Sequence, residues 1–112
     1  MTTIDPTIIT SIHEQGHIWA CAYFGLPIVY TTPNEVAFMC NDVNPLSAIG
    51  VAVAGAAAEI LAFGSIQSDC SQLHGDIEMF VDLQSPHPVG WGHFSSYAIG
   101  IANIMKQDKE QN

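Results

Sequence analysis

Apolar residues recur at helical spacing over residues 6–24, and helix-start and helix-stop signals bound the segment. Asp5-Pro6 reads as an N-cap followed by proline at the first helical position, where the missing N–H has no partner to lose. Gly25 supplies a C-terminal stop, and Pro27 prevents the helix from continuing. The pattern therefore predicts a helix of about eighteen residues.

The character of the chain then changes to two short runs, 28–32 and 36–39, which are β-branched, aromatic or apolar. They flank the turn signal Pro33-Asn34, so they predict two strands in a hairpin. Val29, Tyr30 and Thr31 would form an edge strand of the kind that can hold an extended substrate by backbone pairing. The alternative is a purely structural hairpin.

A second helix is predicted from Pro45 to Phe63, because Asn44-Pro45 repeats the cap-plus-proline signal and Gly64 supplies a stop. Its middle consists largely of Gly and Ala, which lets another helix approach closely. The stretch 43–58 carries no charge, but it is shorter than the roughly twenty residues that a membrane span needs. We therefore expect a buried core helix and no membrane span.

The rest of the chain alternates between polar and apolar segments. Residues 65–75 are polar and predict a loop, 76–83 a short helix, and 85–90 a proline-containing loop. Residues 91–105 have apolar positions at helical spacing and predict a final helix, followed by a frayed polar tail at 106–112. These elements predict one domain over the whole chain, mainly α (α+β), with a small two-stranded β element.

Composition narrows the class of protein. With 48% hydrophobic and 12% charged residues, the sequence is that of a globular domain. The formal charge is −9, and Lys106 and Lys109 are the only basic residues, which argues against nucleic acid or an anionic membrane as a partner. So high an apolar share in a short chain is compatible with a homo-oligomer.

Cysteine usage and the first residues bear on the compartment. Cys21, Cys40 and Cys70 are odd in number, show no C-x-x-C spacing and have apolar neighbours, so we expect buried free thiols and a reducing cytoplasm. Residues 1–5 lack the basic and apolar regions of a signal peptide. A cytoplasmic protein is the expectation.

Residues 13–17 read H-E-x-x-H, the most chemically specific run in the chain. On a helix His13 and His17 share one face and can reach one metal ion, while Glu14 lies beside the open metal position and can take a proton from water. Such a motif is typical of metal-assisted hydrolysis, usually of a peptide bond. The alternative is a pair of surface histidines on an amphipathic helix, but the neighbouring residues are largely apolar.

A catalytic zinc site needs a third protein ligand. Ala20 and Tyr23 stand where the metzincin extension requires Gly and His, so that extension is absent. The remaining candidates are carboxylates: Glu35 in the strand–turn region, Glu59 on the second helix, and Asp76 at the start of the predicted short helix.

Two further blocks follow the H-E-Q-G-H run: G-A-A-A-E-I-L-A-F-G at residues 55–64 and G-D-I at 75–77. In this order they resemble the peptidase domain of the FtsH-type, membrane-anchored ATP-dependent zinc proteases (peptidase family M41), over roughly residues 12–83. That domain has H-E-A-G-H, then G-x-x-A-A-E-x-x-x-F-G, then a zinc-binding aspartate. The resemblance implies a zincin-like helical fold and Zn²⁺ held by His13, His17 and Asp76.

The chain also departs from that family. Asp76 lies farther from Gly64 than the family's aspartate does, so an insertion is implied, and Asp69 and His74 are alternative ligands. Glu59 either orients a ligand histidine or acts as a ligand itself. No G-x-x-x-x-G-K-[ST] run occurs, so we expect a minimal stand-alone form without the ATPase module.

Three functions remain open. The first is a zinc-dependent metallopeptidase that hydrolyses peptides or flexible protein segments, with Glu14 as the catalytic base. The second is a catalytically inactive, M41-like metal-binding or protein-interaction module. The third is a metal-free structural or regulatory subunit whose histidines are merely packed.

Overall fold

The computed structural model describes residues 5–32, 35–38, 45–68, 73, 76 and 91–111. These residues form α1 (Pro6–Phe24), β1 (Ile28–Thr32), β2 (Glu35–Phe38), α2 (Pro45–Phe63) and α4 (Trp91–Gln111). The prediction of a mainly α domain with a small two-stranded element is confirmed. The loop predicted at 85–90 and most of the short helix predicted from Asp76 lie outside the described residues, although Asp76 itself is helical.

The ends of α1 have the caps that the sequence predicts. The side chain of Asp5 accepts a hydrogen bond of 2.8 Å from the backbone N–H of Thr7, which satisfies one of the unpaired donors of the first turn. At the other end Gly25 is left-handed, with φ of 74°, and its N–H donates to the carbonyl of Cys21. The helix that carries the H-E-x-x-H motif is therefore fixed at both ends by local interactions.

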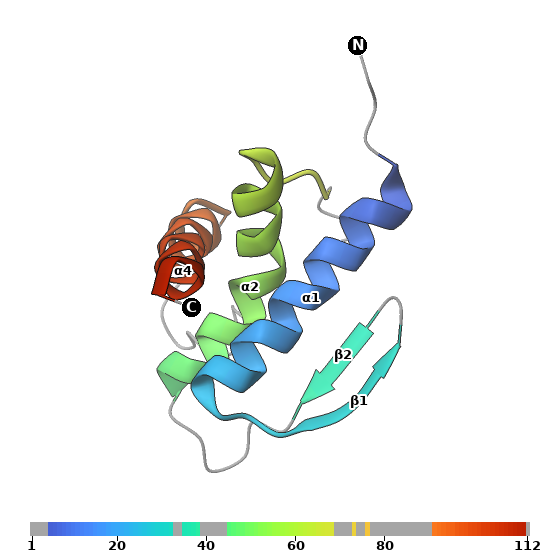
Figure 1. Cartoon of the computed structure of the whole chain (residues 1–112), viewed down its shortest axis with the longest axis vertical. Coiled ribbons are helices and arrows are strands. Elements are labelled where there is room, and N and C mark those ends of the chain that lie inside the picture. Colours follow the sequence, from blue (N-terminus) through green and yellow to red (C-terminus); the bar gives the residue numbers. More distant parts are fainter. Residues whose placement is uncertain are drawn as a thin grey trace.

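Helix α2 lies between α1 and α4 (Figure 1). The hairpin lies on the side of α1 that faces away from α2, and β2 is nearer to α1 than β1 is. β1 and β2 are antiparallel, and Thr31 pairs with Val36. All five residues of β1 are exposed, so the hairpin is held by its backbone pairing and by the contact of β2 with α1.

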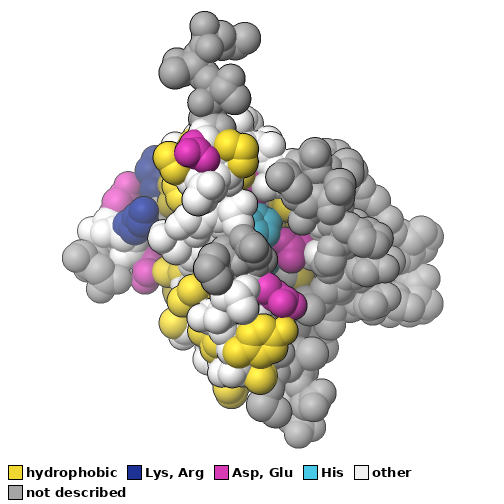
Figure 2. All heavy atoms as spheres, turned by 90° about the vertical axis from the view of Figure 1, so that its right-hand side faces the viewer, with side chains coloured by type: hydrophobic (Ala, Val, Ile, Leu, Met, Phe, Trp, Pro, Cys, Tyr) yellow, Lys and Arg dark blue, Asp and Glu magenta, His cyan; other side chains and the backbone are white. Residues whose placement is uncertain are grey.

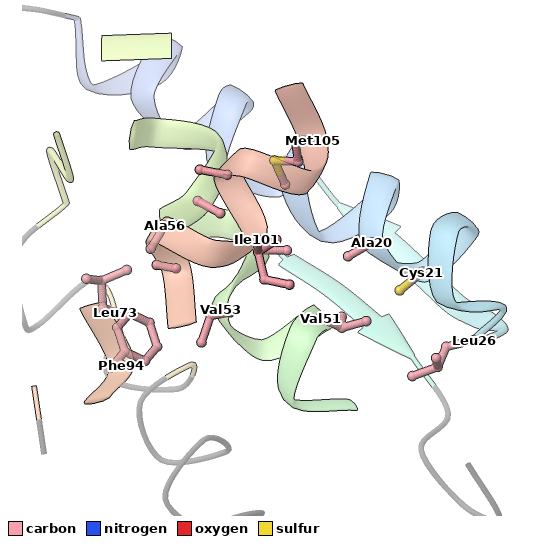
Figure 3. Packing of buried hydrophobic residues seen from close by; sticks show 14 residues of the cluster. Ala20, Cys21, Leu26, Val51, Val53, Ala56, Leu73, Phe94, Ile101 and Met105 are labelled. Carbon is pink, nitrogen blue, oxygen red and sulfur yellow. The ribbon is translucent and has the colours of Figure 1, made fainter. Parts of the chain in front are cut away.

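The hydrophobic core is built around α2, whose residues 51–57 are buried. Figure 3 shows Val51 and Val53 of α2 among side chains from α1 (Ala20, Cys21) and α4 (Ile101, Met105). The two backbones of α1 and α2 approach closely at Gly16. A Cβ there would collide with the carbonyl oxygen of Ala54 and lie 2.7 Å from the Cβ of Ala58. Glycine and alanine thus set the spacing between the helix with the motif and its support.

The prediction of a frayed tail from residue 106 is wrong, because α4 continues to Gln111. The reason is a long-range contact that local polarity does not reveal. The indole Nε1 of Trp19 on α1 donates a 2.9 Å hydrogen bond to the carboxylate of Asp108. Met105 is buried one turn earlier. Together they fix the end of α4 against α1.

Two further predictions concern burial and membranes. Cys21 is a buried free thiol, as expected, whereas Cys40 and Cys70 lie outside the described residues. Among the described helices, none has the length and apolar character needed to cross a membrane.

Candidate metal centre

His13 and His17 lie one turn apart on the face of α1 that packs against α2. Their exposed fractions are 7% and 6%, so both rings are nearly withdrawn from water. Their Nε2 atoms are 3.2 Å apart, and the rings meet edge to face. A histidine side chain is nevertheless visible from the surface, with acidic side chains beside it (Figure 2). The pair is therefore buried but borders on solvent.

The ring of His13 is oriented by Glu59, which is fully buried on α2. The Nδ1 of His13 lies 2.7 Å from Oε2 of Glu59. The same carboxylate accepts hydrogen bonds from the backbone N–H groups of Gln67 and Ser68 and from the Ser68 hydroxyl. Burial raises the pKa of Glu59, but the hydrogen bond with His13 and those from Ser68 outweigh it, so the net pKa is lowered and the carboxylate stays ionised. Ionised Glu59 can only accept, so Nδ1 of His13 carries a proton.

The ring of His17 is oriented by a backbone carbonyl. Its Nδ1 lies 2.7 Å from the carbonyl oxygen of Val51, which has no hydrogen to offer, so this nitrogen must be the donor. In the neutral form of each ring the Nε2 atom is then an acceptor with a free lone pair. Partners on α2 thus aim the Nε2 atoms of both histidines at the same point, which is the arrangement found around metal-binding histidines.

Asp76 is the third side chain at the point where the two Nε2 atoms meet. Its Oδ2 lies 2.8 Å from Nε2 of His13 and 3.2 Å from Nε2 of His17. Burial raises the pKa of Asp76, but hydrogen bonds to both histidines outweigh it and lower the pKa to about 2. For His13, burial instead lowers the pKa, but the hydrogen bonds and charges of Asp76 and Glu59 outweigh burial and raise the pKa to about 10. In the metal-free chain, a proton on His13 therefore stabilises the cluster.

The donor set suits zinc. The three residues offer one ligand atom each, all within 4.8 Å of one another. In a tetrahedral zinc site with bonds of about 2.0–2.1 Å, neighbouring ligand atoms lie about 3.3 Å apart. Two of the three separations here are 3.2 Å, and only the His13–Asp76 separation of 2.8 Å must widen. Two imidazoles and one carboxylate leave a fourth position for water, as in catalytic zinc sites.

Glu14 is half-buried, acts electrostatically with His13, His17 and Asp76, and lines an open groove of about 490 Å³ whose lining includes none of these three residues. Burial raises its pKa, while the two motif histidines act in the opposite direction and Asp76 and Glu35 add to the rise. Among the strand residues predicted to hold substrate, Val29 and Tyr30 are about half exposed, and Thr31 is also exposed. Thr32, which follows them, lines the same groove as Glu14.

Two contributors to the site are not identified by sequence reasoning, although one of them, Gly55, opens the block at residues 55–64. One is the carbonyl of Val51, which any residue would provide. The other is Gly55, where a Cβ would lie 2.5 Å from Nε2 of His13, so that only glycine leaves room for this ring. The alternative ligands Asp69 and His74 lie outside the described residues. Glu59, the third alternative ligand, contacts Nδ1 of His13, whereas Asp76 contacts Nε2 of the same ring.

Comparison with known proteins gives no assignment. No known family model matches the chain, and no curated protein or solved structure is detectably similar to it.

Proposed function

We propose that this chain is a zinc-dependent metallopeptidase that hydrolyses peptides or flexible protein segments. One observation carries the proposal. Two buried imidazoles, each fixed through Nδ1 by a partner on α2, direct Nε2 at the same point as the carboxylate of Asp76. A glutamate follows the first histidine directly and borders a groove open to solvent. The resemblance of residues 12–83 to the FtsH-type peptidase domain points in the same direction.

In this proposal His13, His17 and Asp76 hold Zn²⁺, which when bound supplies a Lewis acid that polarises a peptide carbonyl and acidifies water. Glu59 acts through His13 by keeping Nδ1 protonated and the ring in place. Glu14 accepts the proton of the attacking water and delivers it to the leaving amine. Its raised pKa makes the carboxylate a stronger base toward that water.

A catalytically inactive metal-binding or interaction module is the alternative, and one observation favours it. Among the described residues, no buried side-chain nitrogen or oxygen atom lacks a hydrogen-bond partner. The cluster is thus satisfied by a proton without metal, which also suits a metal-free subunit. Zinc binding distinguishes the metal-free subunit from the other two functions, and peptide cleavage distinguishes the enzyme from the inactive module. The free thiol of Cys21 is in keeping with the proposed cytoplasmic location.

The test is cleavage of a fluorescence-quenched peptide library by zinc-loaded protein, with Glu14→Gln beside the parent. We expect the parent to cleave, and Glu14→Gln to bind zinc equally but to lose at least about 100-fold in kcat, because the proton acceptor is removed. Glu110→Gln, an exposed position near the end of α4, is the matched control and should cleave like the parent. Equal cleavage by the parent and Glu14→Gln would contradict the proposal, as would zinc binding without any cleavage.

A further inference from the structure

The groove beside Glu14 has a distinctive lining. Its walls come from residues 6–18 of α1 and the end of β1. The lining residues are Pro6, Thr7, Thr10, Ser11, Glu14, Gln15, Ile18 and Thr32. Hydroxyl and amide side chains predominate, and Glu14 is the one charged group among these lining residues. A groove of this kind offers hydrogen bonds to an extended peptide.

Apart from the motif histidines, the charged side chains described around the groove are carboxylates. Asp5 caps α1 directly before the groove residue Pro6. Glu35 on β2 is exposed and acts electrostatically on Glu14, as does Asp76. Acidic side chains lie on this face around the visible histidine (Figure 2).

The two lysines do not line the groove. Lys106 and Lys109, the only basic residues in the sequence, both lie on α4. Lys109 lines a different cavity, which lies between the three helices and includes Trp19 and Met105. The lysines appear in dark blue toward the edge of the face in Figure 2, away from the histidine. No other residue of the chain can bring a lysine or arginine to the groove, because the sequence contains no more of them.

We infer that the substrates of the proposed peptidase are cationic peptide segments, with lysine or arginine near the bond that is cleaved; this inference rests on the proposed function. Negative potential of one sign along a groove concentrates cationic ligands there and repels anionic ones. The hydroxyl-lined walls contribute backbone and side-chain hydrogen bonds without selecting for charge. The acidic surroundings therefore set the preference.

The experiment uses three peptides with the same uncharged centre, flanked by Lys-Lys, Gln-Gln or Glu-Glu. Binding of fluorescein-labelled peptides to the metal-free chain is measured by anisotropy, and cleavage of quenched peptides by the zinc-loaded chain. Both are measured at low salt and at about 0.5 M salt, where charges are screened within a few ångströms. We expect the Lys peptide to bind and to be cleaved about tenfold better than the Glu peptide at low salt, with the preference largely lost at high salt.

The variants locate the effect. Glu35→Gln should reduce the ratio between the Lys and Glu peptides, whereas Glu110→Gln on α4 removes the same charge away from the groove and should leave the ratio unchanged. Equal binding of the three peptides, or an equal response to the two variants, overturns the inference. If the Lys peptide binds best and the Glu peptide worst, if Glu35→Gln reduces that difference, and if no peptide is cleaved, the result supports the preference of the groove for cationic peptides and contradicts the proposed function.

Discussion

The contact between α1 and α2 and the β1–β2 hairpin differ sharply in how they are held. At the α1–α2 contact, His13, His17 and Glu59 are nearly or fully buried, and Gly16 brings the two backbones together. In the hairpin every residue of β1 is exposed. The contact places side chains by packing, whereas the hairpin presents an edge whose side chains remain in water.

A metal site and a peptide-binding strand differ in how accurately their atoms must be placed. A metal site requires ligand atoms fixed to within a few tenths of an ångström, which close packing provides. A peptide that binds by backbone pairing requires only an extended edge and tolerates side-chain variation. Changes at the α1–α2 contact should therefore alter stability and metal affinity, and changes in the hairpin should alter only the handling of substrate.

The largest expected effect is that of Gly16→Ala. The new Cβ would collide with the carbonyl oxygen of Ala54, so the helices must separate. We expect a loss of about 1–3 kcal/mol in the free energy of unfolding, measured by urea denaturation. Gly100→Ala on α4 is the matched control, because nothing lies within 4 Å of its Cβ and alanine favours the helix by up to about 1 kcal/mol. Equal effects of the two substitutions would show that the close approach is not required.

A smaller effect is expected from Glu59→Gln. The amide has one acceptor oxygen, so it can accept either from Nδ1 of His13 or from the backbone N–H groups of Gln67 and Ser68, and its NH2 group faces the other donors. It also carries no charge, so it orients and polarises the ring less well. We expect zinc affinity to fall about 10- to 100-fold, measured by competition with a chelating dye. An unchanged affinity would contradict the role of Glu59 as the positioning partner of His13.

The pH dependence of the metal-free chain tests the same cluster without metal. The pKa of His13 is raised to about 10, so its contribution is complete below the unfolded value of 6.5 and declines as pH rises toward 10. The pKa of Asp76 is lowered to about 2, so its contribution is present above 3.8 and declines as pH falls toward 2. We expect stability from this cluster to be greatest between about pH 4 and 6.5. Asp76→Asn should reduce the loss of stability both at acidic and at alkaline pH, measured by urea denaturation across pH. Unchanged losses would argue against the pairing of Asp76 with His13.

The smallest effect on stability is expected in the hairpin. Val29 is 59% exposed, so Val29→Thr should change the free energy of unfolding by less than about 0.5 kcal/mol and leave zinc affinity unchanged. A change in kcat/KM for peptides with those two quantities constant would assign β1 to substrate binding. A loss of zinc affinity in this variant would contradict the separation between the two regions.

The parts of the fold with local causes could be predicted from the sequence. Asp5-Pro6 and Gly25 mark the ends of α1, and Gly64 follows the end of α2, because caps and stops act within a few residues. The extension of α4 to Gln111 could not be predicted, because it accompanies the long-range pairing of Trp19 with Asp108.

The candidate site divides in the same way. The spacing of His13 and His17 is a local, helical property, so the sequence indicates that they share a face. The residues alone make Asp76 one of three carboxylate candidates, and only the resemblance to the FtsH-type domain singles it out, since its approach depends on chain folding over 63 positions from His13. The carbonyl of Val51 could not be anticipated at all, because every residue has one and only tertiary structure selects it.

The most direct measurement of the central claim is zinc content by mass spectrometry, on protein purified without chelator and then supplied with zinc. The parent, Glu14→Gln and Asp76→Asn are compared. We expect about one zinc per chain in the parent and in Glu14→Gln, and a large loss in Asp76→Asn, because two histidines alone hold zinc weakly. No zinc in the parent, or full retention in Asp76→Asn, would contradict a centre built from His13, His17 and Asp76.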